Sequence, residues 1–299
     1  MKTKKSMGDR AFTLALYIGF GIFTVLCAYP FYYLIINSIS ANDASALRQI
    51  NFWPRGIHFQ NYVEILRLPG ISRAALVSVG RTAIGATLTV LASGYLGFMF
   101  TQRKMWRRSF WYRFVIITMY FNAGMIPIFM TMRTLNLTNT FWVYIIPAIV
   151  QPFNIILVKT YVESISSSLQ EAAEIDGAGI LTVFFKIILP ICKPILATVA
   201  IFAAVGQWSA FQDTLLFITD SSLWTLQFLL YTYLNQAHSL AALIQQTGVG
   251  HAAVAAAMRQ TPLSIQMTIS VVVTLPILFV YPFLQRYFVK GIMIGSVKG

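Results

Sequence analysis

Three of the nine carboxylates in this 299-residue chain lie within six positions, in the stretch EAAEIDGAG at residues 171–179. They are Glu171, Glu174 and Asp176, and alanines and glycines surround them. Carboxylates near the start of a helix can accept hydrogen bonds from its free N–H groups, and they suit the positive end of its dipole. They can also pair with a basic partner. The stretch therefore predicts either a well-capped surface helix or a docking element.

The flanking residues predict where this helix begins and ends. Ser168 can cap the helix while Glu171, three residues on, reaches back, which is the spacing of a capping box. Gly177 is expected to stop or turn it, because glycine tolerates the left-handed conformation of helix ends. Ala172 and Ala173 would give the helix a smooth side that fits a groove on another protein. A short helix between two bends can also transmit motion from a partner.

Other residue patterns that carry chemistry are missing from the sequence. The histidines, His58, His238 and His251, show no metal-site spacing, and Cys27 and Cys192 form neither a disulfide framework nor a ligand pair. The sequence contains no G-x-x-x-x-G-K-[ST] phosphate loop. We therefore predict no metal site, no cofactor bound by this chain and no catalytic residue.

The composition is that of a membrane protein. Hydrophobic residues make up 57% of the chain and charged residues 10%, whereas soluble domains carry about 25% charged residues. The net charge of +13 raises the possibility of nucleic-acid binding. However, no basic stripe with interleaved aromatic residues occurs outside the apolar runs, so we predict no nucleic-acid partner.

Six apolar segments come close to the length of about 20 residues that spans a bilayer. They are residues 11–36, 74–100, 110–130, 141–158, 195–218 and 265–283. The first is too long for the apolar region of a signal peptide. With the N-terminus inside, the inner segments hold fifteen Lys and Arg residues and the outer segments hold six. The positive-inside rule therefore predicts an all-α protein with six transmembrane helices and both termini in the cytoplasm.

Several features concern how the spans pack. Gly85, Thr89, Ser93 and Gly97 are four residues apart, so they lie on one helix face and could let another helix approach closely. The alternative is the ordinary use of small residues in a membrane helix. Prolines in or beside the spans break backbone hydrogen bonds and indicate a bundle with an internal cavity. In the outer loop, residues 250–260 are expected to form a short helix.

The acidic stretch then resembles a known family. Glu171-Ala172-Ala173, Gly177 and the run Ile187-x-Leu189-Pro190 match every fixed position of E-A-A-x3-G-x9-I-x-L-P, the EAA motif of bacterial ABC importer permeases. The longer pattern resembles the carbohydrate-uptake branch. The tail at 289–299 is similar to that of the smaller permease in maltose-type importers, and residues 206–217 resemble a Trp-containing fifth span of that group.

The resemblance implies a type I ABC importer permease fold and a role for each part of the acidic loop. In that family the loop forms a coupling helix that docks on an ATPase subunit. The implied coupling residues are Glu171, Ala172, Ala173, Asp176 and Gly177. The implied partners are a second, homologous permease, two ATPase subunits that bind ATP and magnesium, and an external sugar-binding protein. The implied mechanism is alternating access in a bacterial inner membrane.

A sugar path is expected in the fifth span. Gln207, Trp208, Phe211 and Gln212 fall on one helical face, and aromatic rings with amides suit a sugar. The alternatives are contacts between helices or an interfacial tryptophan belt. Tyr120 and Asn122 in the third span are weaker candidates for the path.

Two charged residues near this path do not decide which class of sugar is transported. Asp213 lies so near the outer interface that simple solvation is as good an interpretation as a functional role. Arg81 is interpreted as a snorkelling or structural residue, and its alternative role is to attract an anionic sugar. The stretch around GQWSAF, residues 206–211, resembles permeases for acidic oligosaccharides such as alginate fragments. Uronate and neutral oligosaccharides both stay open as substrates.

The domain plan follows from these predictions. Residues 1–74 comprise an N-terminal segment, the first span and an outer loop. Residues 75–286 form the core, with the coupling loop at about 164–190, and residues 287–299 form a cytoplasmic tail. The alternative function is an ion-coupled secondary transporter, which would need a carboxylate or histidine relay near the membrane midplane. A membrane enzyme is not supported, because the sequence contains no catalytic constellation.

Overall fold

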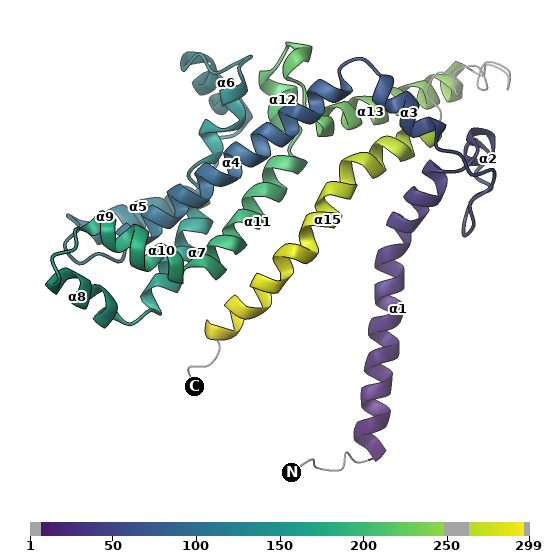
Figure 1. Cartoon of the computed structure of the whole chain (residues 1–299). Coiled ribbons are helices and arrows are strands. Elements are labelled where there is room, and N and C mark those ends of the chain that lie inside the picture. The colour runs from purple at the N-terminus through teal and green to yellow at the C-terminus, as the bar shows by residue number, and fades with distance from the viewer. Residues whose placement is uncertain (1–6, 248–262, 296–299) are drawn as a thin grey trace. The chain divides into compact units, whose positions relative to one another are not determined.

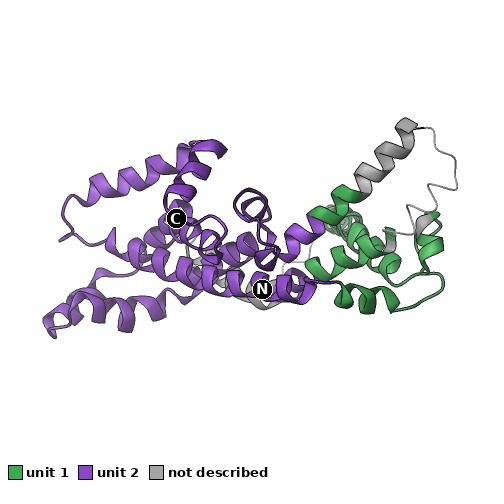
Figure 2. Ribbon diagram, turned by 90° about the horizontal axis from the view of Figure 1, so that it is seen from above, with its two compact units in different colours: residues 1–68, 232–274 green, residues 69–231, 275–299 purple. Residues whose placement is uncertain are grey.

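The structure is a computed structural model of the chain, and it describes residues 7–247 and 263–295. Every regular element in these ranges is a helix, which confirms the all-α prediction (Figure 1). The helix predicted at 250–260 lies outside the described residues. The chain divides into two compact units (Figure 2): unit 1 holds residues 1–68 and 232–274, and unit 2 holds residues 69–231 and 275–299.

Unit 1 begins with the long apolar helix α1 (Met7–Ser38), followed by α2 (Asn42–Ala46) and α3 (Gln60–Arg67). The end of α1 is held by polar side chains. The Ser38 hydroxyl lies 2.7 Å from the Tyr62 hydroxyl, and the side chains of Asn61 and Thr268 each donate to the Ser38 carbonyl at 3.3 Å. A helix end leaves its last carbonyls without intrahelical partners. These bonds therefore allow α1 to end in a buried position.

Unit 2 is organised around α4 (Ile71–Met99), against which α7 (Pro152–Glu163) and α11 (Lys193–Ser209) pack (Figure 1). The other elements that lie wholly in unit 2 are α5 (Arg108–Tyr120), α6 (Met125–Thr134), η1 (Phe141–Tyr144), η2 (Ile146–Ala148), α8 (Ser167–Ile175), α9 (Ile180–Val183), η3 (Phe184–Ile188), α10 (Leu189–Ile191), α12 (Gln212–Phe217) and η4 (Ser221–Leu223). The helices α13 (Leu226–Thr247) and α15 (Leu263–Gly295) contribute residues to both units.

The small residues of α4 form the predicted packing face. Gly85, Thr89, Ser93 and Gly97 are all buried. A Cβ atom added at Gly97 would lie 2.8 Å from the Val158 side chain of α7, and one at Gly85 would lie 2.6 Å from Nε2 of Gln207 on α11. These distances are too short for real contacts, so the two neighbouring helices approach α4 as closely as they do because the side chains are missing. The prediction of a close-packing face is confirmed.

Three of the predicted spans, 110–130, 141–158 and 195–218, are not continuous helices, which corrects the sequence interpretation. The segment 110–130 breaks at residues 121–124, where Gly124 has a φ of +86° and donates its N–H to the Asn122 side chain. The segment 195–218 breaks after Ser209, and α12 begins at Gln212. In each case local turn geometry interrupts an apolar run whose composition alone predicts one helix.

The six predicted spans can be compared with the helices that are long and apolar enough to cross a membrane. Within residues 7–247 and 263–295, two helices are long and apolar enough, Gly8–Ser38 and Ile71–Met99. Two bent pairs raise the number to four if each pair forms one span: Phe141–Ala148 with Pro152–Glu163, bent by 44°, and Ile180–Ile191 with Lys193–Ser209, bent by 82°. Six spans and cytoplasmic termini stay predictions.

Candidate functional site

The acidic helix α8 begins two residues earlier than the capping-box interpretation requires. Its N-cap is Ser166, whose side chain accepts the N–H of Ser168 at 3.4 Å. Ser168 is thus inside the first turn, and its hydroxyl lies 2.7 Å from that of Ser166. Glu171 lies two positions beyond the place from which a side chain reaches back to the cap. The predicted box of Ser168 and Glu171 is therefore wrong, although a serine does cap the helix.

The end of α8 depends on a glycine, as predicted. Gly177 has a φ of +78°, a conformation that glycine adopts without the steric cost of a Cβ atom. Its N–H donates to the Glu174 carbonyl at 3.1 Å, and the N–H of Ala178 donates to the Ala173 carbonyl at 2.9 Å. These two bonds close the helix in the manner of a glycine C-cap.

The two alanines of α8 face in different directions. Ala173 is 9% exposed and belongs to a hydrophobic cluster with Val158, Val183 and Phe184. Ala172 is exposed, as are Glu171, Asp176 and Gly177. The surface of α8 that a partner can reach therefore consists of Ala172 with its acidic neighbours, and Ala173 packs inside its own subunit. The sequence interpretation treated both alanines as one smooth side, and Ala173 corrects it.

The segment that follows α4 holds α8 in place through contacts that the sequence interpretation missed. The Gln102 and Gln170 side chains exchange two amide hydrogen bonds of 2.6 and 3.3 Å, and Gln102 is only 6% exposed. Lys104 Nζ lies 2.7 Å from the Glu174 carboxylate. The hydrogen bond from Lys104 lowers the pKa of Glu174 below its usual value. These partners lie about 70 positions apart in the chain, so no local pattern reveals them.

The acidic helix leads into α11 through a sharply bent segment. The π-helical turn Phe184–Ile188 and the short helix Leu189–Ile191 follow α9. The axis of Ile180–Ile191 then makes an angle of 82° with that of Lys193–Ser209. Phe184 packs edge to face on Tyr95 of α4, with ring centroids 5.4 Å apart. Packed side chains therefore connect α8 to α4 and α11.

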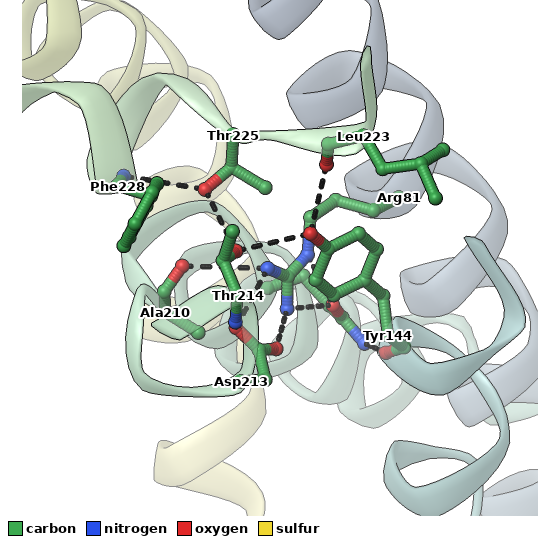
Figure 3. Close-up of polar contacts among 9 residues, drawn as sticks. Arg81, Tyr144, Ala210, Asp213, Thr214, Leu223, Thr225 and Phe228 are labelled. Atoms are coloured by element: carbon green, nitrogen blue, oxygen red, sulfur yellow. Dashed lines mark hydrogen bonds and ion pairs between the residues drawn. The ribbon is translucent and has the colours of Figure 1, made fainter. Parts of the chain in front are cut away.

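A buried cation lies in the interior of unit 2, on the same face of α4 as the small residues. The Arg81 side chain is 2% exposed and donates to both carboxylate oxygens of Asp213, at 3.2 and 2.5 Å (Figure 3). It also donates to Gln207 Oε1 at 3.0 and 2.9 Å and to the Ala210 carbonyl at 3.3 Å. The guanidinium carbon lies 4.3 Å from the centre of the Tyr144 ring. Arg81 therefore uses its donors on protein groups.

These contacts explain the break between α11 and α12. The Ala210 carbonyl follows the end of α11 and takes one of the arginine hydrogen bonds. Asp213 lies in the first turn of α12, where its carboxylate also accepts the N–H of Thr214 at 2.9 Å. The Tyr144 hydroxyl donates to the Leu223 carbonyl at 2.8 Å and lies 3.1 Å from the Thr214 hydroxyl (Figure 3). The structural interpretation of Arg81 is supported, whereas simple solvation of Asp213 is wrong.

A cavity of about 470 Å³ opens beside this cluster. It lies between α4, the segment 141–154, α6 and the α11–α12 region. Its lining residues are Arg81, Thr89, Ile128, Met132, Val143, Tyr144, Pro147, Ala148, Gln151, Phe153, Asn154, Phe202, Ala203, Gly206, Gln207, Ala210, Asp213 and Phe217.

Only one of the six residues predicted to line the sugar path reaches this cavity. That residue is Gln207, which is 5% exposed. The other five do not line it: Trp208 is half-buried, Phe211 stacks on Tyr231, Gln212 and Asn122 are exposed, and Tyr120 is 78% exposed. The helix break after Ser209 removes Phe211 and Gln212 from the face assumed for a continuous helix. The sequence interpretation missed Asn154, although a polar residue inside a predicted span is a functional candidate by default.

The comparisons with known proteins identify the family. Residues 89–294 match the family described as binding-protein-dependent transport system inner membrane component. The chain belongs to this family. It is a permease of an ABC importer, which replaces the alternative of an ion-coupled secondary transporter.

Relatives of the permease are named for sugar transport. It is 33% identical to the polygalacturonan/rhamnogalacturonan transport system permease YtcP of Bacillus subtilis, over 98% of this chain and all of the relative. It is 28% identical to the arabinooligosaccharide transport permease AraQ of Halalkalibacterium halodurans, over 94% and 95% of the two chains. A solved structure of a bacterial ABC transporter involved in the import of the acidic polysaccharide alginate contains a similar chain. The TM-score is 0.81 and the identity 28%, with 96% of this chain and all of that chain covered.

Proposed function

We propose that this permease imports oligosaccharides that carry uronate residues. Two similar proteins support this substrate class: YtcP is named for polygalacturonan and rhamnogalacturonan, and the solved transporter imports alginate. All three polymers contain acidic sugars. Neutral oligosaccharides are the second candidate, because the similar AraQ is named for arabinooligosaccharides.

The proposed topology has six spans with both termini in the cytoplasm of a bacterium. The helix α1 and its outer loop form residues 1–74, the transport core is 75–286, and 287–299 form a cytoplasmic tail. The contacts along α4 support this arrangement. Gln102 and Lys104, just after α4, bind α8, whereas Arg73 near its start donates to the Ser222 carbonyl at 2.9 Å. The acidic helix and the 220–222 loop thus lie at opposite ends of one 29-residue helix.

The proposed coupling surface on α8 consists of Glu171, Ala172, Asp176 and Gly177. These residues are exposed, and the acidic side chains suit a basic cleft on an ATPase subunit. Ala173 supports this surface from inside rather than touching the partner. The chain lacks a phosphate-binding loop in its sequence, so two separate ATPase chains would bind ATP and magnesium. A second permease and an external sugar-binding protein complete the proposed complex.

The proposed mechanism is alternating access. Closure of the two ATPases on ATP would pull the two coupling helices together, and the bent segment between α8 and α11 would pass this movement to the spans. Ligands bias such an equilibrium only through a difference in their affinity for its two states. The binding protein and ATP would provide that difference. The permease itself then needs only weak contacts with sugar.

The observation that carries the proposed coupling to ATPases is the exposed acidic helix α8, held by Gln102 and Lys104 at one end of α4. The test is uptake by proteoliposomes that contain the full complex, ATP inside and the binding protein outside. We expect ATP-dependent uptake of trigalacturonate that persists when a proton uncoupler is added. Uptake of neutral trisaccharides alone would assign the neutral class. Uptake abolished by the uncoupler with ATP inside would contradict ATP-driven transport.

A further inference from the structure

One polar side chain in the wall of the cavity has no partner. Asn154 lies on α7, is 5% exposed and lines the cavity. Within the described part of the chain, its side-chain amide makes no hydrogen bond. Most buried polar groups are paired, and the fully buried side-chain atoms that lack a partner do not include those of Asn154. Its amide therefore reaches accessible space, and because the residue lines the cavity, one donor group and one acceptor are available to whatever enters it.

Most other polar groups of the wall are already used, and Gln151 makes only a long bond, from Nε2 to the Ala148 carbonyl at 3.5 Å. Gln207 accepts from Arg81 through Oε1 and donates through Nε2 to the Tyr144 carbonyl at 3.1 Å. The Thr89 hydroxyl donates to the Ala148 carbonyl at 3.0 Å. Arg81 is paired with Asp213, so the cluster carries no net charge. Among the residues that the structure describes, the wall therefore offers Asn154 and Gln151 to uncharged polar groups and offers no free cation to a carboxylate.

Two aromatic rings lie next to Asn154 in the same wall. Phe153 on α7 and Phe202 on α11 are 51% and 42% exposed, and their ring centroids are 6.2 Å apart at 46°. Ala203 and Gly206 of α11 also line the cavity and leave space because their side chains are small. Apolar rings beside an unpaired amide match the two surfaces of a pyranose, its C–H face and its hydroxyl groups.

We propose that Asn154 binds a hydroxyl group of the transported sugar, in a subsite completed by the rings of Phe153 and Phe202. This inference rests on the proposed function and adds to it where the sugar is contacted and through which groups. The subsite recognises hydroxyls rather than the uronate carboxylate. Selection for the acidic group must then be made elsewhere in the complex.

The test compares Asn154→Leu with wild type in the reconstituted complex, using trigalacturonate and derivatives that each lack one hydroxyl. Leucine keeps the branched shape of asparagine, although it is bulkier, and it cannot hydrogen-bond. We expect sugar transported per ATP hydrolysed to fall roughly fivefold to tenfold, as for one lost hydrogen bond. ATP hydrolysis stimulated by the binding protein should stay near the wild-type level. One deoxy derivative should show the same loss with wild type and no further loss with the variant.

The matched control is Ser93→Ala, because Ser93 is a fully buried residue of α4 whose hydroxyl also has no partner and which lies outside the cavity. It should transport like wild type. Co-purification of the ATPases reports assembly, and Asn154→Ala replaces the leucine variant if that variant fails to assemble. Unchanged transport per ATP in an assembled Asn154 variant would overturn the subsite. If wild type takes up only a neutral trisaccharide, the uronate proposal fails and the same comparison is made with that sugar.

Discussion

At the scale of single residues, Arg81 and Asp213 form a charged pair inside an apolar bundle. The arginine is 2% exposed and the aspartate side chain 22%. Removing charges from water is costly, and a buried pair recovers that cost only when good geometry and further hydrogen bonds accompany it. The contacts to Gln207, Ala210 and Tyr144 supply those bonds. The pair therefore determines where α11 ends more than it adds net stability.

The variant Arg81→Met should be strongly destabilised, because it leaves the Asp213 carboxylate without its counter-charge. The expected loss is about 3–5 kcal/mol in the free energy of unfolding, measured by thermal unfolding of the permease in detergent. The double variant Arg81→Met/Asp213→Leu removes both charges and should recover most of that loss. A double variant as unstable as the single one would show that the ion pair is not the cause.

At the scale of elements, α8 is held by two kinds of contact with the segment after α4. The Lys104–Glu174 pair is exposed, with 85% and 38% of the two side chains accessible, and such pairs contribute about 0–1 kcal/mol. The Gln102–Gln170 pair is better buried. Removing one partner of a buried hydrogen bond costs about 1–3 kcal/mol. The amide pair therefore dominates in holding α8.

Gln102→Leu should lower the sugar transported per ATP hydrolysed more than Lys104→Ala does, because it removes both bonds to Gln170 and leaves that amide only its exposed bond to Glu174. Both variants are measured in the reconstituted complex against wild type.

The pKa of Glu174 is lowered in the folded protein from 4.5. Its contact with Lys104 is therefore complete above pH 4.5 and is lost as the pH falls through the lowered pKa. A larger loss with Lys104→Ala at pH 7 would reverse the ranking.

The glycine that ends α8 gives a second prediction at this scale. Gly177→Pro removes the N–H that donates to the Glu174 carbonyl and demands a φ near −65°, whereas the residue has +78°. We expect ATP hydrolysis to be uncoupled from transport or the ATPases to be lost from the complex. Glu171→Lys should act similarly by reversing an exposed charge. Gly179→Ala serves as the control, because a Cβ there meets nothing within 4 Å. Normal coupling in both test variants would refute the coupling role.

At the scale of the whole molecule, periodic features were predictable from the sequence and non-local contacts were not. The small-residue face of α4 repeats every four residues, so the helical period alone reveals it. The glycine end of α8 follows from local backbone chemistry. By contrast, Arg81 and Asp213 lie 132 positions apart, and the break near Ala210 depends on their contact. The prediction assumed a continuous helix at this point, so it wrongly placed Phe211 and Gln212 on the same face as Gln207.

The topology prediction also belongs to this scale. Single cysteines replace Ser167 on α8 and Ser221 in η4, both exposed, in a background that carries Cys27→Ala. In sealed right-side-out vesicles, a membrane-impermeant maleimide should label the cysteine at 221. The cysteine at 167 should react only after the vesicles are opened. Labelling of position 167 from outside would overturn the orientation of α8.

The missing side chain of Gly85 has an evolutionary consequence. The Gln207 amide occupies the space that a Cβ at position 85 would need, 2.6 Å from Nε2. Substitutions at these two positions should therefore be coupled through steric fit. A homologous permease with alanine at the place of Gly85 is expected to carry a shorter residue at the place of Gln207, and its arginine would then need another acceptor.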